Sequence, residues 1–366
     1  MKVLLISIPI ILFSVFGFLF GNGTKESSGE VNVLSYQELV KDNDWQPAIQ
    51  KAIDDAYKNN EHVVLIPKEL TIKSTINMKP GITLKGTSSP GFYNGLQWIT
   101  DDNEDVTTAK IKAIKSINGS LIEYKEPINN KGITIEDLVL DGNKLVNDVF
   151  YAHSDKDLIE ANIKLDNVGI QGALRDGVRL ERVLTTKIDN SNISANGNYG
   201  VNFNIGASDS VLSENYIHGN QKGGIRMSSG SHYNQVISGK IEDNYGSGIL
   251  LDGSGGGVTN HIVSSVVFHV NNESAINATN GATAIINSSQ IAKNGVTQSN
   301  QYSTNILASG SNTVIQVSNS NFTVGDKTKY NATSLEQSKI IISDSVFNNQ
   351  FYYYGTITSN QNTVIN

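Results

Sequence analysis

The chain has 366 residues, a formal charge of −7 and no cysteine. The lack of cysteine excludes disulfides and thiolate metal sites as sources of stability. The acidic balance, without any basic run, argues against nucleic acid as the main partner, and it means that an acidic ligand would need a local basic patch. Short segments of alternating β-branched and polar residues, separated by Gly, Asn and Ser, indicate an all-β protein.

The N-terminus has the layout of an export signal. Lys2 precedes an apolar run over residues 3–20, and a polar stretch containing Gly and Ser follows. We therefore expect residues 1–21 to form a signal peptide or a membrane anchor and residues 22–43 a linker. The protein should be secreted. It would be held at the cell surface if this segment stays uncleaved, because the run reaches the length of about 17 residues that spans a bilayer.

An amphipathic helix is expected next, at residues 45–59, with Pro47 tolerated in its first turn. Its apolar face is formed by Ala48, Ile49, Ala52, Ile53, Ala56 and Tyr57. Strands are predicted at residues 63–67, 70–76 and 82–86. Since unpaired strand edges invite aggregation, we expect the helix to cover the first of these strands.

A repeat of about two dozen residues runs through the middle of the chain. Apolar anchors stand at Ile170, Ile193, Ile217, Ile241, Phe268 and Ile291, in steps of 23, 24, 24, 27 and 23 residues. Three positions after every anchor but the first comes an asparagine: Asn196, Asn220, Asn244, Asn271 and Asn294. Seven positions after the first five anchors comes a small residue: Gly177, Gly200, Gly224, Gly248 and Ala275.

Each repeat reads as three short strands, which cannot bury an apolar face alone, so successive repeats must stack. Stacking places each strand beside its equivalent one coil on, about 4.8 Å away, in long parallel sheets. Parallel crossovers are right-handed. The sequence therefore predicts an all-β, right-handed parallel β-helix over residues 44–366 with an N-terminal capping α-helix. The repeated asparagines should form an inward ladder of amide hydrogen bonds.

Four segments resemble the pectate lyase superfamily, which includes polygalacturonase-like enzymes and phage tailspike-like depolymerases. They are residues 44–54 (DWQPAIQKAID), 63–67 (VVLIP), 81–86 (GITLKG) and 133–143 (ITIEDLVLDGN). The resemblance implies the same fold and a polysaccharide partner, and it leaves homo-oligomers open. It also implies that the ligand lies along the outer face of the sheet containing residues 224–227.

Two rows of residues are predicted to cover this outer face. The first row is Arg179, Asn202, Arg226 and Leu250, and the second is Glu181, Asn204, Ser228 and Asp252. Asp176 and Tyr199 border the rows from the preceding turn. The apolar residues on either side of the first row should face the core.

The first functional hypothesis is a lyase that cleaves an acidic polysaccharide by β-elimination. This reaction needs a base beside the acidic proton of the sugar and positive charge on the uronate carboxylate. The resemblance implies that arginine serves both roles. The predicted catalytic residues are Arg179, Arg226, Asp176, Glu181 and Asp252, and the predicted substrate-binding residues are Tyr199, Asn202, Asn204 and His218. Alternatively, the two arginines form surface ion pairs with Glu181 and Asp252.

Two alternatives remain. A glycoside hydrolase of the same fold needs two carboxylates at most about 9.5 Å apart, whereas Glu181 and Asp252 should be three coils, or about 14 Å, apart. A non-catalytic β-helix would bind glycan or build a surface or phage-like fibre. An electropositive groove walled by long turns at residues 144–157 and 293–305 would favour the enzyme, and a flat face lined by Asn and Ser would favour the binding protein.

Three further features carry weaker expectations. His218, Glu242 and His269 should share one outward column, with an ion pair between His218 and Glu242. Residues 101–105 (DDNED) offer oxygen ligands for Ca²⁺ but have no recognised metal-binding spacing, so a solvated acidic loop is the alternative. No other cofactor or metal ligand is assigned. Residues 253–257 (GSGGG) should be an inserted turn.

Overall fold

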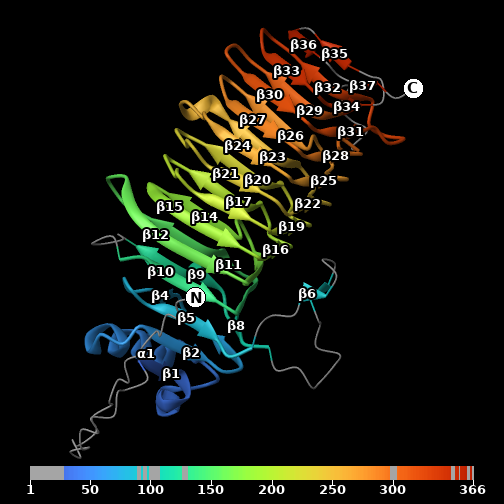
Figure 1. Cartoon of the computed structure of the whole chain (residues 1–366). Helices are drawn as coiled ribbons and strands as arrows, with labels where there is room; N and C mark the ends of the chain where they lie inside the picture. Colours follow the sequence, from blue (N-terminus) through green and yellow to red (C-terminus); the bar gives the residue numbers. More distant parts are fainter. Residues whose placement is uncertain are drawn as a thin grey trace, which may run out of the picture.

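The computed structural model shows one long stack of coils with a helix at its N-terminal end (Figure 1). It describes residues 29–88, 92–93, 97–98, 108–125, 131–296, 303–347, 351–353, 355–360 and 363–364. The predicted export segment, residues 22–28 of the predicted linker and the acidic residues 101–105 lie outside these ranges. Residues 29–43, also predicted as linker, instead belong to the cap and contain a strand of the first sheet and a 3-10 helix. Among the helices that are described, none is long and apolar enough to cross a membrane.

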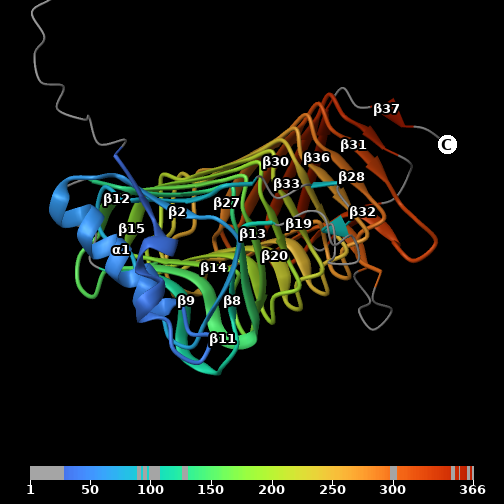
Figure 2. The same ribbon diagram turned by 90° about the horizontal axis from the view of Figure 1, so that it is seen from below.

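The N-terminal cap begins with β1 (Glu30–Asn32), the 3-10 helix η1 (Val33–Leu39) and the helix α1 (Gln46–Asn59). α1 lies across the end of the coils (Figure 2) and buries Ala48, Ile49, Ala52, Ile53 and Ala56. The prediction of a capping helix is thus confirmed. Its predicted apolar face is one residue too wide, because Tyr57 is 52% exposed.

The first sheet has 13 parallel strands in the order of the coils. They are β1, β2 (Val63–Ile66), β5 (Thr83–Gly86), β10 (Ile133–Glu136), β12 (Ile159–Asp166), β15 (Val183–Asp189), β18 (Val211–Ser213), β21 (Gln235–Ile237), β24 (His261–Ser264), β27 (Thr283–Asn287), β30 (Val314–Ser318), β33 (Lys339–Ser343) and β36 (Thr356–Asn360).

The second sheet follows the first around each coil and is also parallel. Its strands are β3 (Glu69–Ile72), β8 (Lys110–Ala113), the first part of β11 (Val139–His153), β13 (Gly169–Ala173), β16 (Asn192–Ser194), β19 (Tyr216–His218), β22 (Lys240–Glu242), β25 (Val267–His269), β28 (Gln290–Ala292), β31 (Asn321–Thr323), β34 (Val346–Phe347) and β37 (Thr363–Val364).

The third sheet completes each coil. Its strands are β4 (Ile76–Asn77), β9 (Ile117–Lys125), the last part of β11, β14 (Val178–Glu181), β17 (Tyr199–Asn204), β20 (Gly223–Ser228), β23 (Ser247–Asp252), β26 (Ile276–Thr279), β29 (Thr304–Ser309), β32 (Tyr330–Ser334) and β35 (Phe351–Tyr353). A separate antiparallel pair is formed by β6 (Phe92–Tyr93) and β7 (Gln97–Trp98).

The core runs along the axis of the coils. On the third sheet, the apolar residues on both sides of the first row are fully buried, as the sequence predicts. They are Val178, Val201, Ile225 and Ile249 on one side, and Leu180, Phe203, Met227 and Leu251 on the other. The two buried positions are two residues apart on each strand, so ordinary alternation turns both inward while the residue between them faces out.

The predicted asparagine ladder lies at the corner between the second and third sheets. Asn196 Nδ2 donates to Asn220 Oδ1 at 3.0 Å, and the same bond links Asn220 to Asn244 at 3.0 Å. The chain continues through Asn271 and Asn294 to Asn305. These amides are fully buried, and each bond satisfies polar groups that water cannot reach.

The residues that follow the ladder must be small because a larger side chain would not fit there. A Cβ atom on Gly200 would lie 2.8 Å from Gly224 O and 2.9 Å from Asn220 Nδ2. Such contacts are closer than van der Waals packing allows. The glycine and the asparagine at this corner are therefore two parts of one tight turn.

One predicted turn is a strand. Residues 144–153, expected to belong to a long turn, are part of β11, which continues without interruption from the second sheet into the third. Phe150 and Ala152 point into the core and alternate with Tyr151 and His153, which point outward, although His153 is only 8% exposed. The inserted turn at residues 253–257 is confirmed and contains the 3-10 helix η2 (Gly253–Gly255). Of the predicted turn at 293–305, residues 297–302 lie outside the described ranges.

Candidate functional site

The candidate site lies on the outer side of the third sheet, where backbone pairing brings two rows of side chains into register. The first row is Glu123, Tyr151, Arg179, Asn202, Arg226 and Leu250. The second row is Lys125, His153, Glu181, Asn204, Ser228 and Asp252. The predicted rows are thus confirmed in register and extended by two coils toward the N-terminus.

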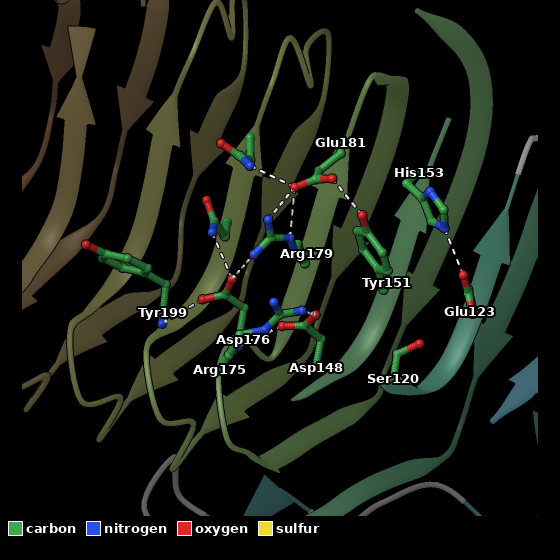
Figure 3. A network of polar contacts seen from close by, with 12 residues as sticks. Ser120, Glu123, Asp148, Tyr151, His153, Arg175, Asp176, Arg179, Glu181 and Tyr199 are labelled. Atoms are coloured by element: carbon green, nitrogen blue, oxygen red, sulfur yellow. Dashed lines mark hydrogen bonds and ion pairs between the residues drawn. The ribbon is translucent and has the colours of Figure 1, made fainter. Parts of the chain in front are cut away.

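Arg179 and Glu181 form the centre of the network (Figure 3). Arg179 Nε donates to Glu181 Oε1 at 2.9 Å, and Nη2 donates to the same oxygen. Tyr151 donates its hydroxyl to Glu181 Oε2 at 2.6 Å, and Asn204 Nδ2 donates to Oε1 at 2.8 Å. Burial alone would raise the pKa of Glu181, but the hydrogen bonds from Tyr151, Asn204 and Arg179 outweigh it and lower the pKa. Glu181 is therefore an anion that orients its neighbours.

Arg179 stays protonated in this setting. Burial works against its charge, but the hydrogen bond and the charge of Glu181 outweigh burial and raise the pKa of Arg179. The base role that the resemblance implied for arginine therefore does not fit Arg179. Its remaining role is electrostatic, because a fixed cation can stabilise negative charge that develops on a bound ligand.

Asp176 lies beneath the rows and is fully buried. It accepts hydrogen bonds from the Tyr199 backbone N–H at 3.1 Å and from Asn202 Nδ2 at 2.8 Å, and Arg179 Nη1 is 3.6 Å from its Oδ2. Burial raises the pKa of Asp176, against the hydrogen bonds that it accepts. A ligand cannot touch this carboxylate, so Asp176 holds residues of the site in place.

A second buried carboxylate, Asp148, was missed by the sequence analysis because it lies in the segment predicted as a turn. It accepts hydrogen bonds from Arg175 Nη2 and from the backbone N–H of Asp176. Its side chain is 1% exposed. Asp148 and Asp176 therefore form a buried acidic layer beneath Arg175 and Arg179.

Tyr151 and His153 were missed for the same reason. His153 Nε2 lies 2.8 Å from Glu123 Oε1, and its Nδ1 lies 3.4 Å from Asp155 Oδ1. Burial and the hydrogen bond to Glu181 raise the pKa of Tyr151, so the phenol is protonated. The signal was present in the sequence, since residues 150–153 (FYAH) alternate like residues 178–181 (VRLE) one coil on.

The predicted pair of Arg226 and Asp252 is confirmed at 2.8 Å. The guanidinium carbon of Arg226 also lies 5.9 Å from the centre of the Tyr199 ring, close enough for a cation–π contact. Burial alone would raise the pKa of Asp252, but hydrogen bonds from Ser254 and Arg226 lower it. Both members of the pair are therefore charged.

Asn202 differs from its prediction as an exposed residue, since it is only 3% exposed. It sits between Arg179 and Arg226 in the first row and is drawn inward by its bond to Asp176. Its Oδ1 has no hydrogen-bond partner among the described residues.

His218 lies on a different face from the other predicted site residues. It is on β19 of the second sheet, in a column with Glu242 and His269 as predicted, and it stacks on Tyr216 at 4.1 Å. The predicted ion pair with Glu242 is wrong: Glu242 accepts from Tyr216 at 2.6 Å and pairs with Lys240 at 2.6 Å and with His269 at 3.5 Å.

The outer face is not the electropositive groove that the lyase hypothesis anticipated. Each arginine of the rows is paired with at least one carboxylate. In the described part of the chain, no group of three or more His, Asp or Glu residues could hold a metal ion. Cavities of about 580 and 290 Å³ open elsewhere, beside the end of α1 and on the first sheet.

Comparisons with known proteins agree on the architecture. Residues 149–322 match a sequence family described as the right handed beta helix region. The A-modules of two Azotobacter vinelandii mannuronan C-5 epimerases have 17% identity and TM-scores of 0.65 and 0.67, and the alignments cover 92% of this chain and 100% and 99% of theirs. No curated protein matches the sequence.

Other solved structures share the fold. Tailspike protein 2 of an Escherichia coli bacteriophage has 12% identity and a TM-score of 0.65, over 86% of this chain and 42% of that one. A surface adhesin of Streptococcus pneumoniae has 13% identity and a TM-score of 0.65, over 92% of each chain. These identities show the fold alone. The architecture expected from the pectate lyase superfamily is confirmed: the chain is a right-handed parallel β-helix protein.

Proposed function

We propose that this protein is an enzyme that binds an acidic polysaccharide along the outer side of the third sheet and removes the C5 proton of a uronate. The observation that carries the proposal is that a phenol, an imidazole and a guanidinium meet on two adjacent coils, at Tyr151, His153 and Arg179. Two of the structurally similar proteins are named as mannuronan C-5 epimerases, which supports a uronate as the substrate.

The first step is removal of the C5 proton, which is acidic only when the neighbouring carboxylate is neutralised. Arg179 supplies a fixed positive charge for that carboxylate. His153 is the base, because its Nε2 is held by Glu123 while its Nδ1 faces the exposed Asp155 at the longer distance of 3.4 Å. A base oriented by a carboxylate is the usual arrangement for proton transfer by histidine.

The second step of β-elimination is departure of the sugar oxygen at C4, which needs a proton. Tyr151 carries that proton because its pKa is raised by burial and by Glu181. Its ring lies between His153 and the guanidinium of Arg179, 5.7 Å from the guanidinium carbon. The leaving oxygen therefore receives a proton from a group different from the one that removes the C5 proton.

The carboxylates of the two rows are spaced too widely for hydrolysis. An inverting hydrolase needs two carboxylates about 6.5–9.5 Å apart. Glu123 lies two coils before Glu181, about 10 Å along the axis even without their lateral offset, and Asp252 lies three coils after Glu181, about 14 Å away. Asp148 and Asp176 are buried and cannot reach a sugar.

The test is incubation of the purified protein with a panel of uronate polysaccharides in D2O. Absorbance from new double bonds reports β-elimination, and deuterium at C5 without cleavage reports epimerisation, which shares the first step. His153→Ala should abolish both signals. The control His269→Ala, which removes an imidazole from the second sheet, should leave them unchanged. Glycan binding without either signal from any polymer would leave the non-catalytic alternative as the function.

Export is a separate part of the proposal, since it rests on the sequence of residues 1–21 alone. Expression of the full chain in a bacterium, followed by mass spectrometry of the extracellular fraction, should find a mature N-terminus beyond Phe20. Full-length protein in the membrane fraction would instead indicate an uncleaved anchor.

A further inference from the structure

The contact between a tyrosine and an arginine at the reactive site recurs two coils further along. Arg179 lies over the Tyr151 ring and pairs with Glu181. Arg226 lies over the Tyr199 ring and pairs with Asp252. In both sets, the tyrosine comes from the coil before the arginine, and the guanidinium is held between an aromatic face and a carboxylate.

The second set differs from the first in its chemistry. Two residues after Tyr151 stands the imidazole of His153, whereas two residues after Tyr199 stands the buried Val201. The second set therefore has no base beside its tyrosine. It retains the part of the arrangement that can bind an anion.

Arg226 is also the more available cation. Arg179 has two carboxylates within 4 Å, Asp176 and Glu181, while Arg226 is paired within the described residues with Asp252 alone. The exposed fraction of the side chain is 28% for Arg226 and 21% for Arg179. An incoming carboxylate therefore meets less competing negative charge at Arg226.

Asn202 lies midway between the two arginines, one coil from each. Its amide nitrogen is committed to Asp176, so the side chain cannot turn over without losing that bond. Its Oδ1 is a buried acceptor that no donor reaches among the residues described here. Asn202 is only 3% exposed, so a ligand cannot reach this oxygen, and the two arginines are the outward groups that a bound anion would contact on these coils.

We propose that Arg226, held by Tyr199 and Asp252, is a second carboxylate-binding subsite. Successive coils are about 4.8 Å apart, so the arginines are about 10 Å apart along the axis. The row thereby selects a polysaccharide whose protein-facing carboxylates recur on every second sugar. This inference rests on the proposed binding of an acidic polysaccharide to this face.

The first test compares Arg226→Gln with the wild type on long and short uronate oligosaccharides. KM for long chains should rise roughly tenfold, as expected for loss of one charged hydrogen-bonded contact, while kcat stays unchanged. Arg226→Lys should recover part of the loss, because a cation remains. The wild type should gain affinity when the oligosaccharide becomes long enough to span both arginines, and Arg226→Gln should not.

The matched control is Lys187→Gln, which removes the cation of another ion pair, with Asp189, on the first sheet. It should leave KM unchanged. A second comparison uses a polymer with a uronate at every second sugar, which should bind as tightly as a polymer made only of uronate. Binding of the alternating polymer that is tenfold weaker would overturn the two-coil period.

The outcomes separate this inference from the proposed reaction. Binding is measured by calorimetry with His153→Ala, so that it does not depend on turnover. Binding that requires Arg226, without any reaction of the wild type, would refute the proposed reaction and support the Arg226 subsite. A His153-dependent reaction in which Arg226→Gln has the same KM and the same length dependence as the wild type would refute the subsite and support the proposed reaction.

Discussion

Tyr151 and His153 stack against each other on the outer side of β11, with ring centroids 4.3 Å apart and ring planes 9° from parallel. Residues two apart on a strand point to the same side, so the stack follows directly from the alternation in this segment. Glu181 holds the edge of one ring and Glu123 the edge of the other. Each ring therefore restricts the rotation of its neighbour, and the phenol and the imidazole keep a fixed separation.

Replacement of Tyr151 by phenylalanine should distinguish the contribution of its hydroxyl from that of ring stacking. The ring can still pack on His153, but no proton reaches the leaving oxygen, so we expect kcat to fall about a hundredfold with little change in KM. Steady-state kinetics on the responsive uronate polymer measures this change. Tyr216→Phe is the control, because it removes the same kind of hydroxyl bond to a glutamate, at 2.6 Å, on the second sheet. Equal losses in both variants would contradict the assigned role.

Removal of one asparagine from the ladder should destabilise the whole coil stack. Asn220→Ala leaves the side-chain and backbone N–H groups of Asn196 without their acceptor. We expect the free energy of unfolding to fall by about 3 kcal/mol, since two buried donors lose their bonds. Chemical denaturation monitored by circular dichroism gives the value. Asn321→Ala, at an exposed position of β31, should change it by less than about 0.5 kcal/mol.

The glycine beside the ladder should be as sensitive as the asparagine. A methyl group on Gly200 meets the backbone oxygen of Gly224 at 2.8 Å, so Gly200→Ala should cost about 2 kcal/mol through displaced backbone. The melting temperature reports the loss. Gly119→Ala is a fair comparison because its new Cβ would come no closer than 3.4 Å to any atom, namely Thr75 Oγ1. Similar melting temperatures for the two variants would refute the packing argument.

His261 should make the fold sensitive to mild acid. It is fully buried, its Nδ1 accepts the backbone N–H of Asn234, and burial lowers its pKa from 6.5 to about 4. The unfolded chain binds a proton as the pH falls below 6.5, whereas the folded protein stays neutral until about pH 4. Stability is therefore complete above pH 6.5 and decreases by about 1.4 kcal/mol per pH unit as the pH falls toward 4.

The variant His261→Asn tests this linkage. An amide oxygen can accept the same backbone N–H, as Asn234 Oδ1 does for Ser210 one coil earlier. The variant should lose the part of the pH dependence between pH 6.5 and 4 that His261 contributes. Denaturant unfolding at pH 7 and pH 5 for both proteins supplies the comparison, and identical pH dependence would show that His261 is not the titrating group.

The fold could be predicted from sequence because one apolar residue, one asparagine and one glycine recur in each coil, and each has a separate physical reason. The anchor fills the core, Asn220 links to Asn244, and Gly200 leaves room for the turn. The pairing of Arg179 with Glu181 and of Arg226 with Asp252 also follows from this register.

Two parts of the site could not be predicted in this way. Tyr151 and His153 lie on a strand that continues through the corner, where Asn143 follows Leu140 by three residues but the register then shifts between Asp141 and Val146. His218 was placed correctly in an outward column with Glu242 and His269, but that column lies on the second sheet, apart from the other predicted substrate-binding residues. Alternation distinguishes inside from outside, but it does not tell which of three sheets a strand joins.

The ladder continues beyond the coils of the candidate site, through Asn271, Asn294 and Asn305. Each coil there rests only on its two neighbours, so these coils contribute length without contacting Tyr151, His153 or Arg179. A deletion or duplication that joins equivalent asparagines would therefore remove or add one whole coil in this half. The half that contains Tyr151, His153 and Arg179 would keep its register, and the length of the outer face would change by about 4.8 Å for each coil.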